Sequence, residues 1–515
     1  MRKATEWFFE ERGPTACDPA PCRDYNQTTS PGMGMFYRGA EMCGTRPDLP
    51  ADVKANAICV IEGVNGVLFP NGTQMMLAGD RDDCNAEAAM SAAMRAALEQ
   101  LPGGNKTAAA HFATIGKGLL RTLFTHSGAQ INSSYQSWGH VKGYAALGPK
   151  ECPEGGCIST GPRVPRPPSI ENFYSDDNSR ITLGAIAAVN LLDSSDHDAD
   201  ILSLAFALLR TTGPDGFRAA QLHFTSIESN GWQHFFDTPG KDGMDNPHFI
   251  AQLWANFFWA HKVTGIEWFK TQALKGLAAY MASWPKIVAT ESITEEQTRL
   301  MLPLAWRVRV EDTPAHRAEL RECWAALKKT WAWAGVPTCT MSPYGQLCPS
   351  CTTNQCYGNG ERSVCQETGD PASDVLYESN YLLLNLQEAF AATGEQDYAQ
   401  HAEQLAQYIA RIQASSTMYP QYHGTWFRGF DYSRWEVFGS NADWGWPAFG
   451  IETGWTVTWI TAGLGVHELP QYKSFWGLVT ARDLSAVAGR LCPEFFEANA
   501  TVVCAKAATA AAGPS

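Results

Sequence analysis

Apolar residues recur every three to four positions over long stretches of the chain, which is the spacing of one face of an α-helix. In residues 247–263 and 397–413 the positions that follow this spacing are Ile250, Leu253, Trp254, Phe257 and Phe258, and Ala402, Leu405, Ala406 and Ile409. Between such stretches the pattern is interrupted by short polar segments. The spacing therefore predicts a protein built mainly from helices.

The predicted helices come in pairs joined by short turns. The six pairs are 86–100 with 108–126, 178–192 with 197–211, 248–262 with 266–283, 294–309 with 313–332, 374–392 with 396–414, and 448–465 with 473–490. Two turns repeat a motif, because Thr264-Gly265 and Thr393-Gly394 are each followed by an aromatic residue and an alanine at the same offsets. Glycine after a helix provides a left-handed cap, and a repeated hairpin indicates a solenoid or a closed ring. Six pairs predict an all-α (α/α)6 toroid, with the first helix of each pair inside and the second outside.

Residues 1–80 and 127–172 lack this helical period and are rich in Gly, Pro, Asn and Cys. Residues 161–169 (GPRVPRPPS) are expected to be extended, because proline cannot continue a helix. We expect a Cys-rich N-terminal extension over 1–80 that packs on the barrel and a six-hairpin catalytic domain over 81–490. A disulfide-tethered tail over 491–515, with a disordered end, completes the predicted organisation.

The composition narrows the class of protein. Hydrophobic residues make up 45% of the 515 residues and charged residues 18%, which indicates a large folded core. The chain has no run of eighteen apolar residues, so we expect no membrane partner. The net charge of −14 and the lack of a Lys/Arg cluster argue against a nucleic-acid partner. The 18 Trp, 16 Tyr and 24 Phe suit either a large helical core or sites that stack against sugar rings.

Fifteen cysteines and five N-x-S/T sequons (Asn26, Asn71, Asn105, Asn132 and Asn499) favour a secreted protein in an oxidising compartment. Residues 1–8 have no apolar signal-peptide core, so we expect the leader to be missing from this sequence. An odd number leaves at least one thiol unpaired, and Cys323, inside a helical pattern, is the candidate. The cysteines at 339, 348, 351, 356 and 365 allow a zinc site, but their irregular spacing favours two disulfides, and we expect neither metal nor cofactor.

Acids and amides gather where the first helix of most pairs begins. They are Asp82, Asp83, Asn85, Glu87, Asp176, Asp177, Asn178, Asp245, Asn246, Asp374, Glu378, Asn380, Asn441, Asp443 and Glu452. Helix capping accounts for one such residue per helix, not for several in succession. In a ring with parallel inner helices these starts converge at one mouth. Carboxylates interleaved with tryptophan there predict a sugar-binding cup with acid and base groups.

Residues 424–459 combine six tryptophans with several charges, of which we expect about half to form structural salt bridges, with Arg428 and Arg434 pairing Asp431 and Glu436. Glu452 is predicted in the first turn of an inner helix, where Gly450 and Gly454 leave room for a ligand. The adjacent Asp176 and Asp177 cannot both be caps, so one is expected to face the cup, where a second acid would raise its pKa. The predicted catalytic residues are Asp177, Glu452, Asp176 and Asp443. The predicted substrate-binding residues are Tyr174, Tyr377, Glu378, Trp444, Trp446, Trp455, Arg434 and Glu436.

Several segments together resemble the six-hairpin glycosidase superfamily over roughly residues 80–465. They are DDCNAE (82–87), YSDDNSR (174–180), MLPLAWRVRVEDTP (301–314), SDVLYESNY (373–381), and FDYSRWEVFGSNADWGW with IETGW (430–446 and 451–455). The resemblance implies an (α/α)6 barrel and glycoside-cleaving chemistry by an acid and a base acting on water. Unsaturated glucuronyl hydrolases share this fold and use an Asp at the start of an inner helix, which by resemblance implicates Asp176 or Asp177.

The leading hypothesis is therefore a glycoside hydrolase that cleaves an oligo- or polysaccharide by carboxylate acid/base catalysis. The alternatives are a polysaccharide lyase of the same fold, a sugar epimerase and a non-catalytic carbohydrate-binding protein. A lyase would use Tyr174, Tyr377 or His248 as its base, with Arg434 or Arg428 neutralising a uronate. An epimerase is disfavoured because the twelve histidines are scattered. Motifs of serine hydrolases, P-loop enzymes, zinc proteases and dinucleotide-binding proteins are not found in a fitting context.

Overall fold

The computed structural model describes most of the chain. The described residues are 1–10, 17–18, 28–29, 36–38, 43, 49–68, 74–127, 130–133, 136–140, 172–243, 246–347, 364, 371–419, 422–437 and 449–505.

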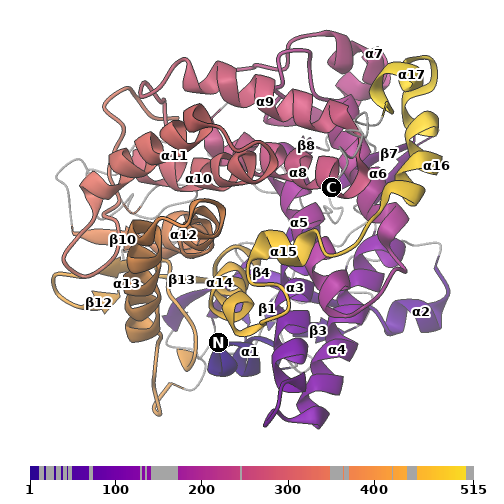
Figure 1. Ribbon diagram of the computed structural model, residues 1–515. Coiled ribbons are helices and arrows are strands. Elements are labelled where there is room, and N and C mark those ends of the chain that lie inside the picture. Colours follow the sequence, from indigo (N-terminus) through magenta and orange to yellow (C-terminus); the bar gives the residue numbers. More distant parts are fainter. Residues whose placement is uncertain are drawn as a thin grey trace.

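Six helices form a closed inner ring (Figure 1). They are α3 (Asp82–Gln100), α5 (Ser175–Leu191), α8 (Pro247–Thr264), α10 (Ile293–Val310), α12 (Asn380–Thr393) and α14 (Trp459–Gly465). Each packs against the next in chain order, and α14 packs back against α3. Five of them lead into an antiparallel outer helix: α4 (Lys106–Arg121), α6 (Asp198–Arg210), α9 (Glu267–Met281), α11 (Pro314–Leu327) and α13 (Gln396–Ile412). The predicted (α/α)6 toroid is confirmed.

Burial explains which helices are inside. All residues of α5 but the last are buried, whereas α13 buries one face, formed by Tyr398, Ala402, Leu405, Tyr408, Ile409 and Ile412. The outer helices are therefore the amphipathic ones, because their other face contacts solvent. Gly265 and Gly394 cap α8 and α12 with φ of 72° and 76°, so the two repeated turns fold as predicted.

The sixth pair departs from the prediction of an outer helix over 473–490. The short helix α15 (Phe475–Val479) contacts α5 and α12, and α16 (Ser485–Phe496) packs against α6 and α8. The carboxylate of Glu388, near the end of α12, accepts hydrogen bonds from the backbone N–H groups of Phe475 and Trp476 at 2.7 and 3.1 Å. The indole of Trp259 and the amide of Asn190 bind the last carbonyls of α15. The segment therefore closes the end of the ring where the inner helices finish (Figure 1).

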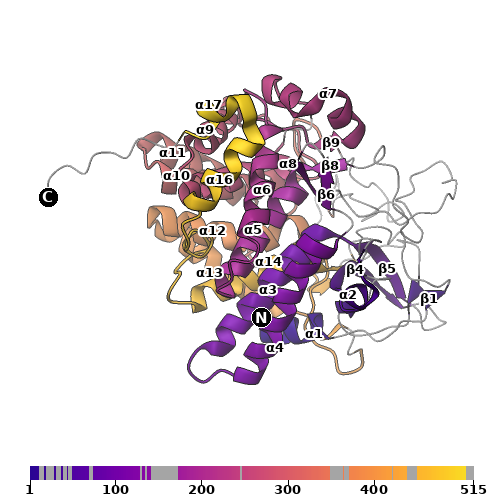
Figure 2. The same ribbon diagram turned by 90° about the vertical axis from the view of Figure 1, so that its right-hand side faces the viewer.

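The N-terminal extension contributes a sheet that packs beside the barrel (Figure 2). Its strands are β1 (Cys17–Asp18), β2 (Thr28–Thr29), β3 (Phe36–Arg38), β4 (Ile58–Leu68) and β5 (Gln74–Asp80), joined by β13 (Gly450–Glu452) in the order β1-β2-β5-β4-β13 with β3 on β4. Helix α1 (Arg2–Phe8) packs on α3, and α2 (Ala51–Ala55) precedes β4. Glu452 was expected in the first turn of a helix, but it pairs with Gly63 in the antiparallel strand β13. The inner helix begins later, after the π-helical turn η6 (Thr453–Thr458).

The remaining described elements are short, except for the 14-residue helix α7. They are η1 (Thr122–His126), β6 (Gln130–Ser133), β7 (Gln136–His140), β8 (Asn172–Tyr174), β9 (Gln221–His223), α7 (Phe224–Asp237), η3 (Lys328–Thr330), β10 (Ala372–Asp374), η4 (Val375–Ser379), β11 (Gly429–Asp431), β12 (Glu436–Val437), η7 (Val466–Glu468), η8 (Glu497–Asn499) and α17 (Ala500–Val503). Among the described helices, none is long and apolar enough to cross a membrane.

Disulfides join Cys43 to Cys59 and Cys492 to Cys504, and the second bond lies within the segment 491–515. Cys323 is a buried free thiol, which confirms the candidate for the unpaired cysteine, and Cys84 is a second buried free thiol that was not anticipated. Cys339 is disulfide-bonded. The other four cysteines of the 339–365 segment lie outside the described residues, so its two disulfides stay a prediction.

Candidate active site

The starts of the inner helices meet at one end of the ring, opposite α15. Arg180 of α5 contacts Asp83 of α3, His248 of α8 contacts Glu295 of α10, and Ser292 donates to Glu378 just before α12. The predicted convergence is confirmed for residues 174–180 and 374–380. Residues 441–448, expected at the same mouth, lie outside the described residues.

Two arginines organise the carboxylates at the starts of α3 and α5. We call this group the α3–α5 cluster; its members are Arg81, Asp83, Glu87, Asp176, Asp177 and Arg180. The guanidinium of Arg81 binds Asp83 through two nitrogens, at 3.0 and 2.9 Å, and Asp177 Oδ1 at 2.9 Å. The guanidinium of Arg180 binds Asp83 at 2.5 Å and Asp177 Oδ1 at 2.8 Å. All six side chains are buried, so these ion pairs are shielded from solvent.

The indole of Trp455 completes this cluster from η6. Its Nε1–H donates to Asp83 Oδ2 at 2.8 Å, and the guanidiniums of Arg81 and Arg180 lie 4.5 and 4.6 Å from the centre of its ring. Cation–π contacts of this kind are strongest in buried sites. Trp455 was predicted to bind substrate; in the structure its ring contacts both arginines and its indole N–H binds Asp83, and the substrate-binding role stays a prediction.

The same cluster drives the pKa values of its carboxyls apart. Burial opposes ionisation of Asp83, but the combined attraction of Arg81 and Arg180 and the Trp455 hydrogen bond outweigh it and lower the pKa. For Asp177 burial prevails, with repulsion from Asp83 and Asp176 added to it, and raises the pKa to about 7. Burial likewise raises the pKa of Glu87 to about 8. A neutral acid beside an ionised carboxylate is the arrangement that acid/base catalysis requires.

The two oxygens of Asp177 have different surroundings. Oδ1 accepts from both guanidiniums, whereas Oδ2 is enclosed and has no hydrogen-bond partner among the described residues. A proton on this carboxyl therefore belongs on Oδ2, the oxygen that is not already bonded to cations. In the protonated form, Oδ2 is therefore the donor atom of this carboxyl.

A second group lies at the starts of α8 and α10. We call it the α8–α10 cluster; its members are His248, Glu295, Glu296 and Arg299. Glu295 Oε1 lies 2.5 Å from His248 Nδ1 and 3.2 Å from the guanidinium of Arg299. Burial lowers the pKa of His248, but the attraction of Glu295 outweighs it, so the net shift is upward. Burial and the neighbouring Glu295 raise the pKa of Glu296 to about 7.

Aromatic side chains connect the two clusters across the inside of the ring. The ring centre of Tyr377 lies 5.6 Å from that of Trp455 and 5.4 Å from that of His248. The ring centre of Tyr381 lies 5.3 Å from that of Trp459 and 4.6 Å from the guanidinium of Arg299. Because these contacts join α5 to α8 through η6 and η4, both clusters face one shared interior.

Arg428 was expected to pair within its own segment, with Asp431 or Glu436. Its guanidinium binds Asp374 at 3.0 Å and Glu291 at 2.8 Å instead, and lies 4.9 Å from the Tyr377 ring centre. Glu378, a predicted substrate-binding residue, is buried beside Asp374, and burial raises its pKa well above the usual range.

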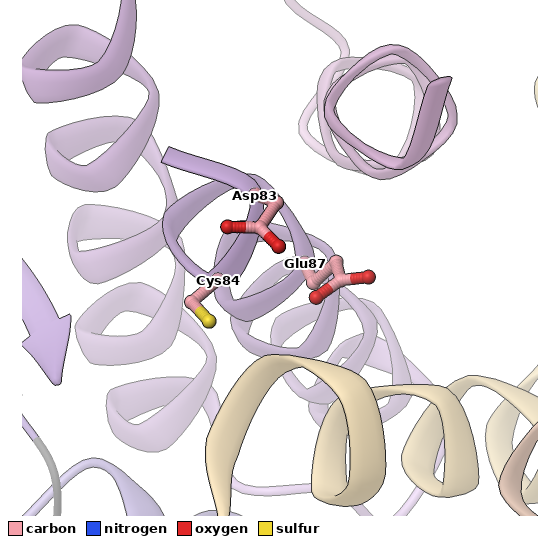
Figure 3. Close-up of side chains that lie close together, drawn as sticks. All are labelled: Asp83, Cys84 and Glu87. Atoms are coloured by element: carbon pink, nitrogen blue, oxygen red, sulfur yellow. The ribbon is translucent and has the colours of Figure 1, made fainter. Parts of the chain in front are cut away.

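Asp83, Cys84 and Glu87 lie close enough together to suggest a metal site. Figure 3 shows them on the first turns of α3, beside the helical segment formed by η6 and α14. Both oxygens of Asp83 are already bound by cations or by Trp455, and Glu87 Oε1 accepts from the Trp459 indole at 2.6 Å. Burial also raises the pKa of the Cys84 thiol, which disfavours the thiolate a metal needs. With two guanidiniums adjacent, this group favours a carboxylate–arginine network over a cation site.

The other predicted residues fall in three places. Tyr174 is half-buried at the end of β8, where its carbonyl accepts from the side chain of Asn178 at 2.8 Å. Arg434 and Glu436 are exposed near the β11–β12 turn, where Arg434 Nη1 lies 3.6 Å from Glu436 Oε1. Asp443, Trp444 and Trp446, and the side chain of Glu452, lie outside what the structure describes.

Gly454 was expected to leave room for a ligand, but the structure shows that the space beside it is filled. A Cβ at this position would lie 2.3 Å from Glu87 Oε2 and 2.7 Å from the Cα of Cys84. The glycine therefore permits close packing of η6 on α3, which brings Trp455 and Trp459 to the carboxylates.

We did not predict Arg81, Glu295 or Arg299 as site residues. Arg180 did stand inside the YSDDNSR motif, and Glu295 and Arg299 have the i,i+4 spacing of a helical ion pair. Both features could have indicated the clusters from the sequence, because a buried arginine at a helix start needs acidic side chains around it.

A comparison with protein-family models gives no match, and neither does a comparison with curated proteins. Solved structures do show a similar arrangement of helices. One is a D-mannose isomerase (12% identity, TM-score 0.49, 80% of this chain and 91% of the other). Another is a cellobiose 2-epimerase from Bacillus thermoamylovorans (9% identity, TM-score 0.49, 79% and 92%). A third is a cellobiose 2-epimerase from Spirochaeta thermophila (10% identity, TM-score 0.47, 83% and 92%). At these identities the likeness concerns the fold.

Proposed function

We propose that this protein is a glycoside hydrolase in which Asp177 is the general acid. The observation that supports this proposal is the setting of the Asp177 carboxyl. One oxygen is bound by Arg81 and Arg180, the other has no partner among the described residues, and burial raises the pKa to about 7. A carboxylic acid that stays protonated near neutral pH is what protonation of a glycosidic oxygen needs.

In the proposed reaction the Asp177 proton moves to the glycosidic oxygen as the bond between that oxygen and the anomeric carbon breaks. Water then adds to the anomeric carbon and gives a proton to an ionised carboxylate. Glu452 is the sequence-based candidate for this base. Glu295 is the candidate from the described residues, since its Oε2 has no hydrogen-bond partner there.

The sugar-stacking role stays with the predicted Trp444 and Trp446. Trp455 and Tyr377, the other predicted aromatics, already have arginines against their rings. Their proposed role is to position the acids.

The test is release of reducing sugar from a panel of oligo- and polysaccharides by wild type, Asp177→Asn and Glu452→Gln. Asp177→Asn should lower kcat by roughly 10²–10⁴, the usual size of a general-acid effect, and should remove the alkaline limb of the pH profile. Glu388→Gln is the matched control, because Glu388 is a buried acid with a raised pKa at the closed end of the ring. It should leave the pH profile unchanged. An Asp177→Asn enzyme with wild-type kcat and pH profile would show that Asp177 is not the acid.

A second candidate, a polysaccharide lyase, rests on the His248–Glu295 pair. A carboxylate on Nδ1 orients an imidazole so that Nε2 can remove a proton, as in other histidine bases. A lyase product carries a new C=C bond and absorbs ultraviolet light, whereas a hydrolase product does not. Products that absorb and that depend on His248 would favour the lyase.

We also propose an extracellular location. It is supported by the disulfides Cys43–Cys59 and Cys492–Cys504, since such bonds persist mainly in oxidising compartments. Glycan attached at the exposed Asn105 of a eukaryotically expressed protein, detected by mass spectrometry, would support the location.

A further inference from the structure

A pocket lies on the outer wall of the barrel, away from the inner helices that carry the two clusters. Its volume is about 390 Å³, within the usual range of small-molecule sites. It is formed by the segment that follows η3 and by the outward face of α13. The lining residues are Trp331, Ala332, Trp333, Ala334, Gly335, Gln404, Gln407 and Arg411.

The floor of this pocket is held in place by its own contacts. The Trp331 indole donates to Gln404 Oε1 at 3.0 Å, and its ring lies 4.8 Å from His401 in an edge-to-face arrangement. Arg411 donates to the carbonyl of Ala334 at 3.0 Å. Gly335 has a φ of +86°, and a Cβ there would lie 3.2 Å from the Gln404 carbonyl, so the loop sits directly on α13. A rigid pocket binds a ligand without first having to become ordered.

One wall of the pocket is the largely exposed side chain of Trp333. The side chain of Trp333 is 77% exposed, and its ring centre is 6.3 Å from Tyr432. The polar groups beside it are the Gln407 amide and the Arg411 guanidinium. One of the five N–H groups of this guanidinium donates to the carbonyl of Ala334. A flat apolar face next to amide and guanidinium groups matches a pyranose ring, whose C–H face stacks and whose hydroxyls form hydrogen bonds.

We propose that this pocket is a second carbohydrate-binding site, which holds a chain of the polysaccharide outside the barrel. The choice of carbohydrate rests on the proposed function, whereas the existence of a ligand site rests on the pocket itself. Because α13 is an outer helix, the site does not depend on Asp177 or on the α8–α10 cluster.

The test is electrophoresis in native gels that contain xylan, barley β-glucan or polygalacturonate. At least one of these polysaccharides should retard wild type, and Trp333→Ala should weaken the binding derived from the retardation by about tenfold or more. Trp333→Ala is expected to fold, because so little of the side chain is buried. Tyr344→Ala is the control, since Tyr344 is also exposed but does not line the pocket.

The outcomes separate this proposal from the proposed function. Asp177→Asn should be retarded like wild type, so loss of catalysis with retained binding supports a distinct site. Retardation that depends on Trp333 supports the pocket even if no polysaccharide is cleaved. No retardation in any of the three gels, or equal retardation of wild type and Trp333→Ala, would overturn the proposal. A change of oligomeric state in Trp333→Ala without polysaccharide, measured by sedimentation, would overturn it in favour of self-association.

Discussion

Replacing Asp177 with asparagine is expected to change how stability depends on pH. The pKa of this carboxyl is raised from 3.8 to about 7 in the folded protein, chiefly by burial. A raised folded-state pKa means that the folded state holds the proton more tightly than the unfolded state. The stability that the protonated carboxyl contributes is therefore complete below about pH 4 and is lost as the pH rises through about 7.

The size of this effect follows from the shift. A difference of about 3 pKa units corresponds to about 4 kcal/mol between pH 4 and pH 8. An asparagine side chain cannot ionise, so the free energy of unfolding of Asp177→Asn relative to wild type should rise by up to about 4 kcal/mol over this range.

Urea denaturation at pH 4, 5, 6, 7 and 8, followed by tryptophan fluorescence, measures the difference. Asp52→Asn, which changes an exposed acid of α2, should differ from wild type by a constant amount. If the difference between Asp177→Asn and wild type is equally constant, then the pKa of Asp177 is ordinary and its assignment as the acid loses its support.

Three further predictions concern packing and cysteine chemistry. Gly454→Ala should lower the free energy of unfolding by about 1–3 kcal/mol, because the added Cβ would meet Glu87 and Cys84. Gly489→Ala in α16 is the control, and it should be neutral or stabilising because a Cβ there has nothing within 4 Å. Equal urea midpoints for the two variants would contradict this. Trp455→Phe should cost about 1.5–3 kcal/mol in the same assay, because it removes a hydrogen bond to the buried Asp83 carboxylate, and an unchanged midpoint would argue that the bond contributes nothing. Residues 339–365 should contain two disulfides, so the purified protein should carry no stoichiometric zinc by elemental analysis, and zinc whose removal unfolds the protein would refute the prediction.

The helix pairs and their order were predictable from the sequence because helical periodicity and glycine caps act within a few residues. Gly265 and Gly394 show this, as does the gathering of acids where the inner helices begin. A ring of six parallel inner helices then brings these starts together, so Asp176, Asp177, Tyr377 and Glu378 could be placed near one another before their contacts were known.

The contacts themselves depended on the tertiary structure. Trp455 donates to Asp83 across 372 residues of sequence, and Arg180 reaches Asp83 across 97. No local pattern indicates such partners, so the bond between Trp455 and Asp83 was not predicted and Arg428 was expected to form a local ion pair. The same reason accounts for the sixth pair, where Glu388 of α12 captures the backbone of Phe475 and turns a predicted outer helix across the end of the ring. Periodicity along the chain determined which residues are helical and which face is apolar. Long-range packing decided the surroundings of each buried carboxyl, because burial and the charges contributed by distant segments together shift its pKa.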